Sequence, residues 1–267
     1  MNTISELMSL QGRRALITGA AGGLGQVMAD TLAELGADLV LVDRSATNLA
    51  ILEKDLREKW PVAIQKLECD LENEGQRLAM IEAVKADGCG LSILINNAAF
   101  VGVSNLKGWA VPFEEQTLCT WRQAMEVNLT AVFHLCQAFT PLLSSEGRGN
   151  IINIGSIYGE YGPDWGLYAG TTMGNPAAYA ASKGGLIQLT RWLATTIAPK
   201  VNVNAISPGG VFRNQAEVFV KRYQKRTPLQ RMATENDFRG AVAFLASDLS
   251  RYVTGQNLFV DGGFGVW

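Results

Sequence analysis

The sequence has too few histidines, and cysteines too far apart, for several common chemistries. Its 267 residues include one histidine, His134, and four cysteines at positions 69, 89, 119 and 136, with no C-x-x-C pair. Familiar zinc sites need several such ligands at close spacing. We therefore expect no metal site. His134 lies inside the apolar helical stretch AVFHLCQAF, where a structural histidine is favoured over a catalytic one, so a Ser-His-Asp hydrolase is disfavoured.

The sequence also lacks strong charge and long apolar runs. Lys and Arg total 23 against 25 for Asp and Glu, a formal net charge of −2, so no field would draw nucleic acid or an anionic membrane surface. No stretch reaches the about 18 uninterrupted apolar residues of a membrane helix, and no apolar run near the start has signal-peptide length. Because four unclustered thiols suit a reducing compartment, we expect a cytoplasmic protein without nucleic-acid or membrane partners.

Short runs rich in β-branched residues alternate with longer helical patterns along the whole chain. This alternation is typical of right-handed βαβ units and of a parallel sheet. With 48% hydrophobic residues and no repeat or linker, the chain is suited to one larger α/β domain spanning residues 1–267. We predict a doubly wound parallel sheet of about seven strands flanked by helices. The predicted strands are 15–18, 39–43, 63–68, 93–96, 151–154, 201–206 and 258–260, and the predicted helices are 23–35, 48–60, 74–86, 117–143, 177–198 and 235–246.

The first predicted strand ends in a glycine-rich turn, TGAAGGLG, at residues 18–25. Gly19, Gly23 and Gly25 allow a tight turn and let a diphosphate approach the backbone amides that open the next helix, whose partial positive charge suits an anion. An ordinary flexible turn is the alternative. The position between a strand and a helix favours a dinucleotide site of the Rossmann type, which includes Leu24. The spacing T-G-x-x-x-G-x-G differs from the commoner G-x-G-x-x-G.

An acidic residue, Asp43, ends the second predicted strand, 24 residues after Gly19. A carboxylate there accepts hydrogen bonds from the adenosine ribose and repels the extra phosphate of NADP. Arg44 follows it and would oppose this preference, but the turn itself has no basic residue to hold a 2′-phosphate. We therefore predict NAD as the cofactor, with NADP as the less favoured alternative.

Further candidates for the cofactor site follow the third and fourth strands, because ligands of open parallel sheets bind outside the carboxyl ends of the strands. Asp70 either meets the adenine amino group or simply begins the next turn, and Leu71 follows it. Asn97 and Ala98, directly after the fourth strand, are predicted to border the cofactor.

The predicted helix 177–198 contains a tyrosine and a lysine four residues apart, Tyr179 and Lys183. Residues at this spacing share one helix face. A tyrosine is a poor proton-transfer group at neutral pH because its ordinary pKa is about 10, but a nearby ammonium favours the phenolate. The pair is therefore a candidate general acid/base, and a surface pair on the helix is the alternative.

Taken in order, these motifs make the chain similar to members of the short-chain dehydrogenase/reductase family. The resemblance covers nearly the whole sequence. Besides the motifs above, it includes Ser156 and two segments, SPG at 207–209 and TGQ…VDGG at 254–263. It also includes Asn128 within Val-Asn-Leu. Each motif is modest alone, but six in the right order are specific.

The resemblance implies hydride transfer between a nicotinamide and a carbonyl or secondary alcohol. It assigns Tyr179 as proton donor or acceptor and Lys183 as the group that lowers its pKa and holds the nicotinamide ribose. Ser156 would hydrogen-bond the substrate oxygen where negative charge develops, and Asn128 would hold a water that connects Lys183 to solvent. The resemblance also places Pro208, Gly209 and Val211 beside the nicotinamide and implies a homotetramer of 222 symmetry, although a dimer is an alternative.

The sequence departs from the pattern usual in that family in three ways: at one residue, in one segment and in one spacing. Ala99 stands where a glycine commonly follows Asn-Asn-Ala, and the segment after Gly209 reads Gly-Val-Phe-Arg where many members have a threonine that touches the nicotinamide carboxamide. The largest departure is the separation of 23 residues between Ser156 and Tyr179, which is longer than usual.

The extra residues fall within the segment 158–175, called the insertion below. Aromatic rings interleaved with polar groups suit a polyol or a sugar-derived substrate, and a lid or subunit-contact loop is the alternative. The residues concerned are Tyr158, Glu160, Tyr161, Asp164, Trp165, Tyr168, Thr171 and Asn175.

A basic run at 221–226, KRYQKR, is a second possible substrate determinant. It either recognises a phosphate or carboxylate or forms a solvated helix face.

On balance we predict an NAD-linked enzyme that interconverts a secondary alcohol and a ketone, with a sugar-derived or other small polar hydroxy compound as its small-molecule substrate. The alternatives are a 3-oxoacyl-thioester (acyl-carrier-protein) reductase and, in a different class, a non-catalytic dinucleotide-binding regulatory protein.

Overall fold

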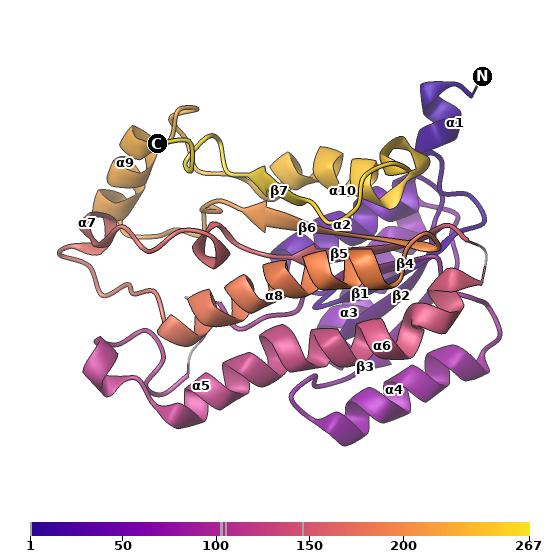
Figure 1. Cartoon of the computed structure of the whole chain (residues 1–267), viewed down its shortest axis with the longest axis horizontal. Helices are drawn as coiled ribbons and strands as arrows, with labels where there is room; N and C mark the ends of the chain where they lie inside the picture. The colour runs from indigo at the N-terminus through magenta and orange to yellow at the C-terminus, as the bar shows by residue number, and fades with distance from the viewer. Residues whose placement is uncertain (1, 102–103, 105, 146) are drawn as a thin grey trace.

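The computed structural model describes residues 2–101, 104, 106–145 and 147–267. It contains a seven-stranded sheet in the order β3-β2-β1-β4-β5-β6-β7, with all neighbouring strands parallel (Figure 1). Because the order reverses direction between β1 and β4, the crossover helices lie on both faces and the sheet is doubly wound. The strands are β1 (Arg14–Thr18), β2 (Asp38–Asp43), β3 (Ile64–Glu68), β4 (Ile93–Asn96), β5 (Gly149–Ile154), β6 (Val201–Pro208) and β7 (Asn257–Val260).

The strands bury alternate side chains in two separate cores. Ile17 and Leu41 lie in the core under α2, α3 and α10, whereas Leu16 and Val40 lie in the core under α4, α6 and α8 (Figure 1). This is why both faces of the central strands read as apolar in the sequence. The α-helices are α1 (Ile4–Met8), α2 (Gly23–Glu34), α3 (Ala46–Lys59), α4 (Glu74–Ala86), α5 (Leu118–Met125), α6 (Ala131–Ser144), α7 (Trp165–Tyr168), α8 (Ala177–Thr196), α9 (Glu217–Arg226) and α10 (Arg239–Ala246).

The predicted fold class is confirmed, and each of the seven predicted strands agrees with the structure to within two residues at either end. β4 and α4 have the predicted bounds. The short helices α1, α7 and α9 were not predicted as elements, because each has few residues or a mainly polar composition. Within the described ranges, no helix is both long and apolar enough to cross a membrane.

The predicted helix 117–143 is interrupted in the structure. α5 passes into a five-residue π-helical turn, Glu126–Thr130, before α6 begins at Ala131. A π turn inserts an extra residue into the helical ladder and leaves no trace in hydrophobic periodicity, which is why the sequence predicts one helix. Asn128 lies in this turn and is buried.

Candidate active site

A cavity of about 760 Å³ lies outside the carboxyl ends of the strands, with walls from the segments that follow β1, β2, β3, β4, β5 and β6. Its volume is in the range of cofactor and ligand sites. Most residues predicted from the sequence line it. They are Gly19, Gly23, Leu24, Asp43, Asp70, Leu71, Asn97, Ala98, Ser156, Tyr179, Lys183, Pro208, Gly209 and Val211.

The glycine-rich turn fits a dinucleotide because it brings bare backbone to the cavity. Gly19 has φ of 62°, and a Cβ built there would lie 2.8 Å from the Cα of Ala98, so only glycine fits. Asn97 holds the turn by donating its side-chain amide to the carbonyls of Thr18 and Gly19, at 3.0 and 2.9 Å. The Thr18 hydroxyl in turn accepts the backbone N–H groups of Asn97 and Ala98, at 3.0 and 3.1 Å.

Gly25 does not line this cavity, so its predicted role in cofactor binding would be indirect. It lies in the first turn of α2, where a Cβ would approach the Gly19 carbonyl oxygen to 2.1 Å and the Ala20 Cα to 2.8 Å. The third glycine of the motif therefore allows the helix to pack against the turn. Gly25 thus affects the shape of the glycine-rich turn without lining the cavity.

Asp43 and Asp70 both border the cavity, and each also organises its own loop. The Asp43 carboxylate accepts the backbone N–H of Ala21 at 3.1 Å and that of Ser45 at 3.3 Å, which ties the glycine-rich turn to the end of β2. Asp70 accepts the N–H of Glu72 at 3.0 Å, as expected for a residue that begins a turn. Each carboxylate oxygen keeps a lone pair that can serve a ligand.

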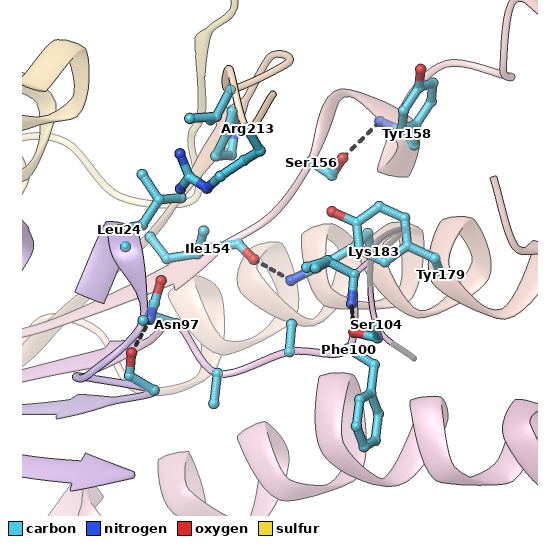
Figure 2. Close-up of a pocket in the computed structure, with 18 of the residues that line it drawn as sticks. Leu24, Asn97, Phe100, Ser104, Ile154, Ser156, Tyr158, Tyr179, Lys183 and Arg213 are labelled. Carbon is cyan, nitrogen blue, oxygen red and sulfur yellow. Dashed lines mark hydrogen bonds between the residues drawn. The ribbon is translucent and has the colours of Figure 1, made fainter. Parts of the chain in front are cut away.

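Ser156, Tyr179 and Lys183 meet on the cavity wall between β5 and α8 (Figure 2). Ser156 is 5% exposed, accepts the N–H of Tyr158 at 3.1 Å, and lines the cavity together with Tyr179. Lys183 is 3% exposed and donates its ammonium to the Ile154 carbonyl at 2.6 Å, at the end of β5. The two hydroxyls and the ammonium thus share one pocket, as the spacing of the residues predicts.

The expected lowering of the Tyr179 pKa by Lys183 is not seen in this structure. Burial raises the pKa of Tyr179, and the nearby Ser156 hydroxyl offsets this only in part. Burial also lowers the pKa of Lys183 to about 8, because its ammonium lies in a poorly solvated site. The Lys183 Nζ lies 5.9 Å from the centre of the Tyr179 ring and is bonded to backbone, so its charge does not outweigh desolvation of the phenol.

Asn128 does not line the cavity, and its expected role of holding a water between Lys183 and solvent stays a prediction. Its side-chain amide donates to the Phe100 carbonyl at 3.1 Å and to the Ser182 hydroxyl at 3.1 Å, and its oxygen accepts the Phe100 N–H at 2.8 Å. Phe100 does line the cavity, and Ser182 adjoins Lys183 in α8. Asn128 therefore links the π turn to the loop after β4 and to the helix that carries the catalytic candidates.

Comparison with known proteins identifies the family. A family model described as enoyl-(acyl carrier protein) reductase matches residues 19–265. The chain is 34% identical over 270 residues to galactitol 2-dehydrogenase (L-tagatose-forming) of Cereibacter sphaeroides, which covers 97% of each chain. The chain belongs to the short-chain dehydrogenase/reductase family. It is an NAD(P)-dependent oxidoreductase that acts on CH–OH groups, as the sequence predicts.

Solved structures of this family superpose closely on this protein. A gluconate 5-dehydrogenase from Burkholderia cenocepacia J2315, in complex with NADP and tartrate, has a TM-score of 0.87 and 32% identity over 99% of this chain and 100% of its own. An NAD⁺-bound xylitol dehydrogenase has a TM-score of 0.83 and 29% identity over 95% of this chain and 99% of its own. Both kinds of nicotinamide cofactor thus occur among similar structures.

In the present protein, part of the insertion forms a polar wall of the cavity. The hydroxyls of Tyr158 and Tyr168 lie 2.7 Å apart, and Asn175 lines the same part of the cavity. Asn175 is 7% exposed, and its Oδ1 has no hydrogen-bond partner among the described residues. A buried acceptor without a partner costs free energy, which a ligand donor would recover.

The rest of the insertion points elsewhere. Tyr161 stacks on Phe259, Trp165 is exposed, and Asp164 pairs with Arg226 at 3.3 Å. The interleaved pattern in the sequence therefore overstates the polar wall, because a loop without regular periodicity does not reveal which side chains face inward.

The basic run 221–226 lies on α9, and none of its cationic side chains lines the cavity. Lys221 pairs with Glu217 at 2.6 Å, and Arg226 pairs with Asp164. Lys221 and Lys225 are exposed, as on the solvated helix face that was one of the two interpretations, whereas Arg222 and Arg226 are half-buried and bind the insertion. The opposite face of α9 borders the cavity, because Phe219 and Tyr223 line it.

Several cavity residues were missed by sequence reasoning. Phe219, Tyr223 and Met232 close the cavity from the α9 side. The Tyr223 hydroxyl accepts the N–H of Gly210 at 2.5 Å, and burial raises its pKa to about 12. The only signal available was the i, i+4 spacing of Phe219 and Tyr223, which predicts a buried helix face without saying what it covers.

Proposed function

We propose that this protein oxidises a secondary alcohol of a small polyhydroxy compound, or reduces the corresponding ketone, with NAD(H) as cofactor. The observation that carries the proposal is that the hydroxyls of Ser156 and Tyr179 and the ammonium of Lys183 line one cavity, which is continuous with the glycine-rich turn and with the polar wall of the insertion. A regulatory protein that only binds the dinucleotide does not need these groups.

The proton chemistry follows from the positions of these side chains. When an alcohol is oxidised, the phenolate form of Tyr179 accepts the hydroxyl proton and becomes the neutral phenol, and in ketone reduction the neutral phenol donates that proton to the substrate oxygen. Ser156 donates a hydrogen bond to the substrate oxygen as negative charge develops on it. Lys183, anchored on the Ile154 carbonyl, supplies positive charge beneath the site. A nicotinamide bound in the cavity supplies the acceptor or donor of the hydride.

The choice of NAD over NADP rests on Asp43. Its carboxylate borders the cavity at the end of β2 and keeps acceptor capacity for ribose hydroxyls, while its negative charge opposes a 2′-phosphate. Arg44 borders the same cavity and works in the opposite direction. Of the similar structures, the gluconate 5-dehydrogenase complex contains NADP and the xylitol dehydrogenase contains NAD⁺.

We expect NADH to bind at least about tenfold more tightly than NADPH, a difference of about 1.4 kcal/mol. Asp43→Asn should narrow this ratio, because the amide removes the charge and keeps one acceptor for the Ala21 N–H. Fluorescence titration of both reduced cofactors measures the two affinities. Asp55→Asn, the same change at an exposed position of α3, is the control and should leave the ratio unaltered. Tighter binding of NADPH by the unaltered protein would refute the choice of NAD.

The polyhydroxy class of substrate is supported by two independent observations. The Tyr158–Tyr168 hydroxyl pair and the unpartnered Oδ1 of Asn175 offer both donors and acceptors near Ser156 and Tyr179. Several similar proteins are named for sugars or polyols, including galactitol 2-dehydrogenase, a probable galactose dehydrogenase of Rhizobium meliloti and the xylitol dehydrogenase.

We expect Tyr168→Phe to raise KM for polyols about 3- to 10-fold, the effect of losing one hydrogen bond, and to leave a simple secondary alcohol unaffected. Initial rates followed by absorbance of the reduced nicotinamide provide the measurement. Tyr161→Phe, in the same insertion but outside the cavity, is the matched control. Equal losses for both classes of substrate would argue against a hydroxyl-binding role for the insertion.

The second candidate function is reduction of 3-oxoacyl thioesters. It is favoured by the description of the matching family model and by 29% identity over 261 residues to a 3-oxoacyl-[acyl-carrier-protein] reductase of Aquifex aeolicus. A panel of sugars, polyols and β-hydroxyacyl thioesters separates the two functions. Turnover of thioesters alone would replace the polyol proposal.

Residues 1–267 are further proposed to form a single domain that assembles as a homotetramer in the cytoplasm. Support for subunit contacts comes from large apolar side chains that remain exposed on the helices of one face. They are Leu118 and Trp121 on α5, Phe133 on α6 and Trp192 on α8.

A further inference from the structure

Arg213 is a cation placed over the glycine-rich turn by the segment that follows β6. Its guanidinium lies beside Leu24 at the start of α2, and it lines the cavity (Figure 2). A Cβ built on Gly23 would be only 2.7 Å from its Nη2. In this segment the family pattern commonly has a threonine, whereas this chain has Gly-Val-Phe-Arg at 210–213.

The guanidinium is held from one side and open on the other. Its Nη1 donates to the Phe212 carbonyl at 3.1 Å and forms an ion pair with Glu235, which does not line the cavity. Within the part of the chain that the structure describes, Nη2 and Nε make no hydrogen bond. Since guanidinium donors form a planar fork, anchoring Nη1 orients the remaining donors.

The backbone amide groups at the start of α2 and the Arg213 guanidinium together favour an anion in the cavity. α2 begins at Gly23 with no side-chain cap and no acidic residue in its first turn, so its amide groups and the Arg213 charge are all positive. Glu235, contributed by the 3₁₀ turn Glu235–Phe238, pairs with Arg213, and its Oε1 would lie 3.1 Å from a Cβ built on Gly23, so it approaches the helix end from outside the cavity. A second anion arriving through the cavity would therefore be bound by the amides and by Arg213 together.

We propose that Arg213 binds the diphosphate of the nicotinamide dinucleotide through its Nη2 and Nε, and that Glu235 holds the guanidinium in position. The proposal rests on the dinucleotide site of the proposed function and adds a residue to it. It also commits to the diphosphate and not to the 2′-phosphate of NADP, because Arg213 contacts Gly23 and Leu24, whereas Asp43 and Arg44 border the ribose end of the turn.

The test measures binding without turnover. NADH is titrated by fluorescence, and ADP-ribose, adenosine and NADPH are ranked by their displacement of NADH. Arg213→Met should weaken NADH, NADPH and ADP-ribose equally, by about 10- to 100-fold, the effect of losing a hydrogen bond between charged groups. Adenosine, which has no phosphate, should change less than about twofold. Arg213→Lys should restore part of the affinity, because it returns the charge without the fork.

Lys221→Met is the matched control, because this cation on α9 is exposed and lies outside the cavity. It should leave all four affinities unchanged, and thermal melting verifies that each variant is folded. An equal loss for adenosine, or no loss for ADP-ribose, would overturn the proposal. A loss confined to NADPH would reassign Arg213 to the 2′-phosphate. Failure of the proposed function would instead show as absence of NADH binding by the unaltered protein.

Discussion

Tyr179→Phe is expected to lower kcat for alcohol oxidation by about 10²- to 10⁴-fold, the range for loss of a general acid/base. The substitution removes the phenolic oxygen and retains the ring, so the cavity keeps its shape. NADH affinity should therefore stay within about twofold of the unaltered protein. Steady-state rates with the best substrate of the panel and a fluorescence titration of NADH provide the two measurements.

The pH profile adds a signature that a structural role would not produce. Because burial raises the pKa of Tyr179, the base form is populated only toward alkaline pH, so oxidation should accelerate and ketone reduction should slow as pH rises. This dependence should disappear in Tyr179→Phe. Tyr252→Phe, at a fully exposed tyrosine, is the control and should match the unaltered protein. Retention of turnover in Tyr179→Phe would remove the catalytic assignment.

Gly25→Ala is expected to weaken NADH binding by at least about tenfold and to lower the free energy of unfolding by about 1–3 kcal/mol, the usual cost of overpacking. The added methyl group would lie 2.1 Å from the Gly19 carbonyl oxygen, so α2 or the glycine-rich turn must shift. The displaced turn would then carry its amide groups away from the diphosphate. Chemical denaturation and fluorescence titration measure the two effects.

Gly240→Ala provides the opposite case on a helix. Gly240 lies in α10, is exposed, and a Cβ there would meet no atom within 4 Å. Replacing it should raise the free energy of unfolding by about 0.5–1 kcal/mol, because alanine is the better helix former, and should leave NADH affinity unchanged. If Gly25→Ala behaved like Gly240→Ala, the close approach between α2 and the turn would not be a requirement of the site.

The sheet and much of the site could be predicted because their signals are local. Buried parallel strands require apolar runs, so 93–96 was identified with the bounds that β4 has. The i, i+4 spacing of Tyr179 and Lys183 sets their shared helix face before any tertiary contact forms. Gly19 and Asp43 were found for a similar reason, since each follows a strand whose carboxyl end borders the cavity.

Other features depend on contacts between segments far apart in the chain. The π turn around Asn128 is stabilised by Phe100 and Ser182, which neither helical periodicity nor composition can report. The position of Gly25 behind the turn depends on how α2 packs. The pKa of Tyr179 depends on how completely the assembled walls exclude water, and burial outweighs the charge that the sequence placed nearby.

What the sequence determined by itself is the order of strands and helices, the glycine-rich turn, and the presence of a tyrosine and a lysine on one helix face, since all of these follow from neighbouring residues. Only the tertiary structure decided which side chains of the insertion reach the cavity, that α9 turns its apolar face and not its cations inward, and that Arg213 lies over α2. The reason is that burial and electrostatic environment arise from packing between distant segments, and packing has no local signature.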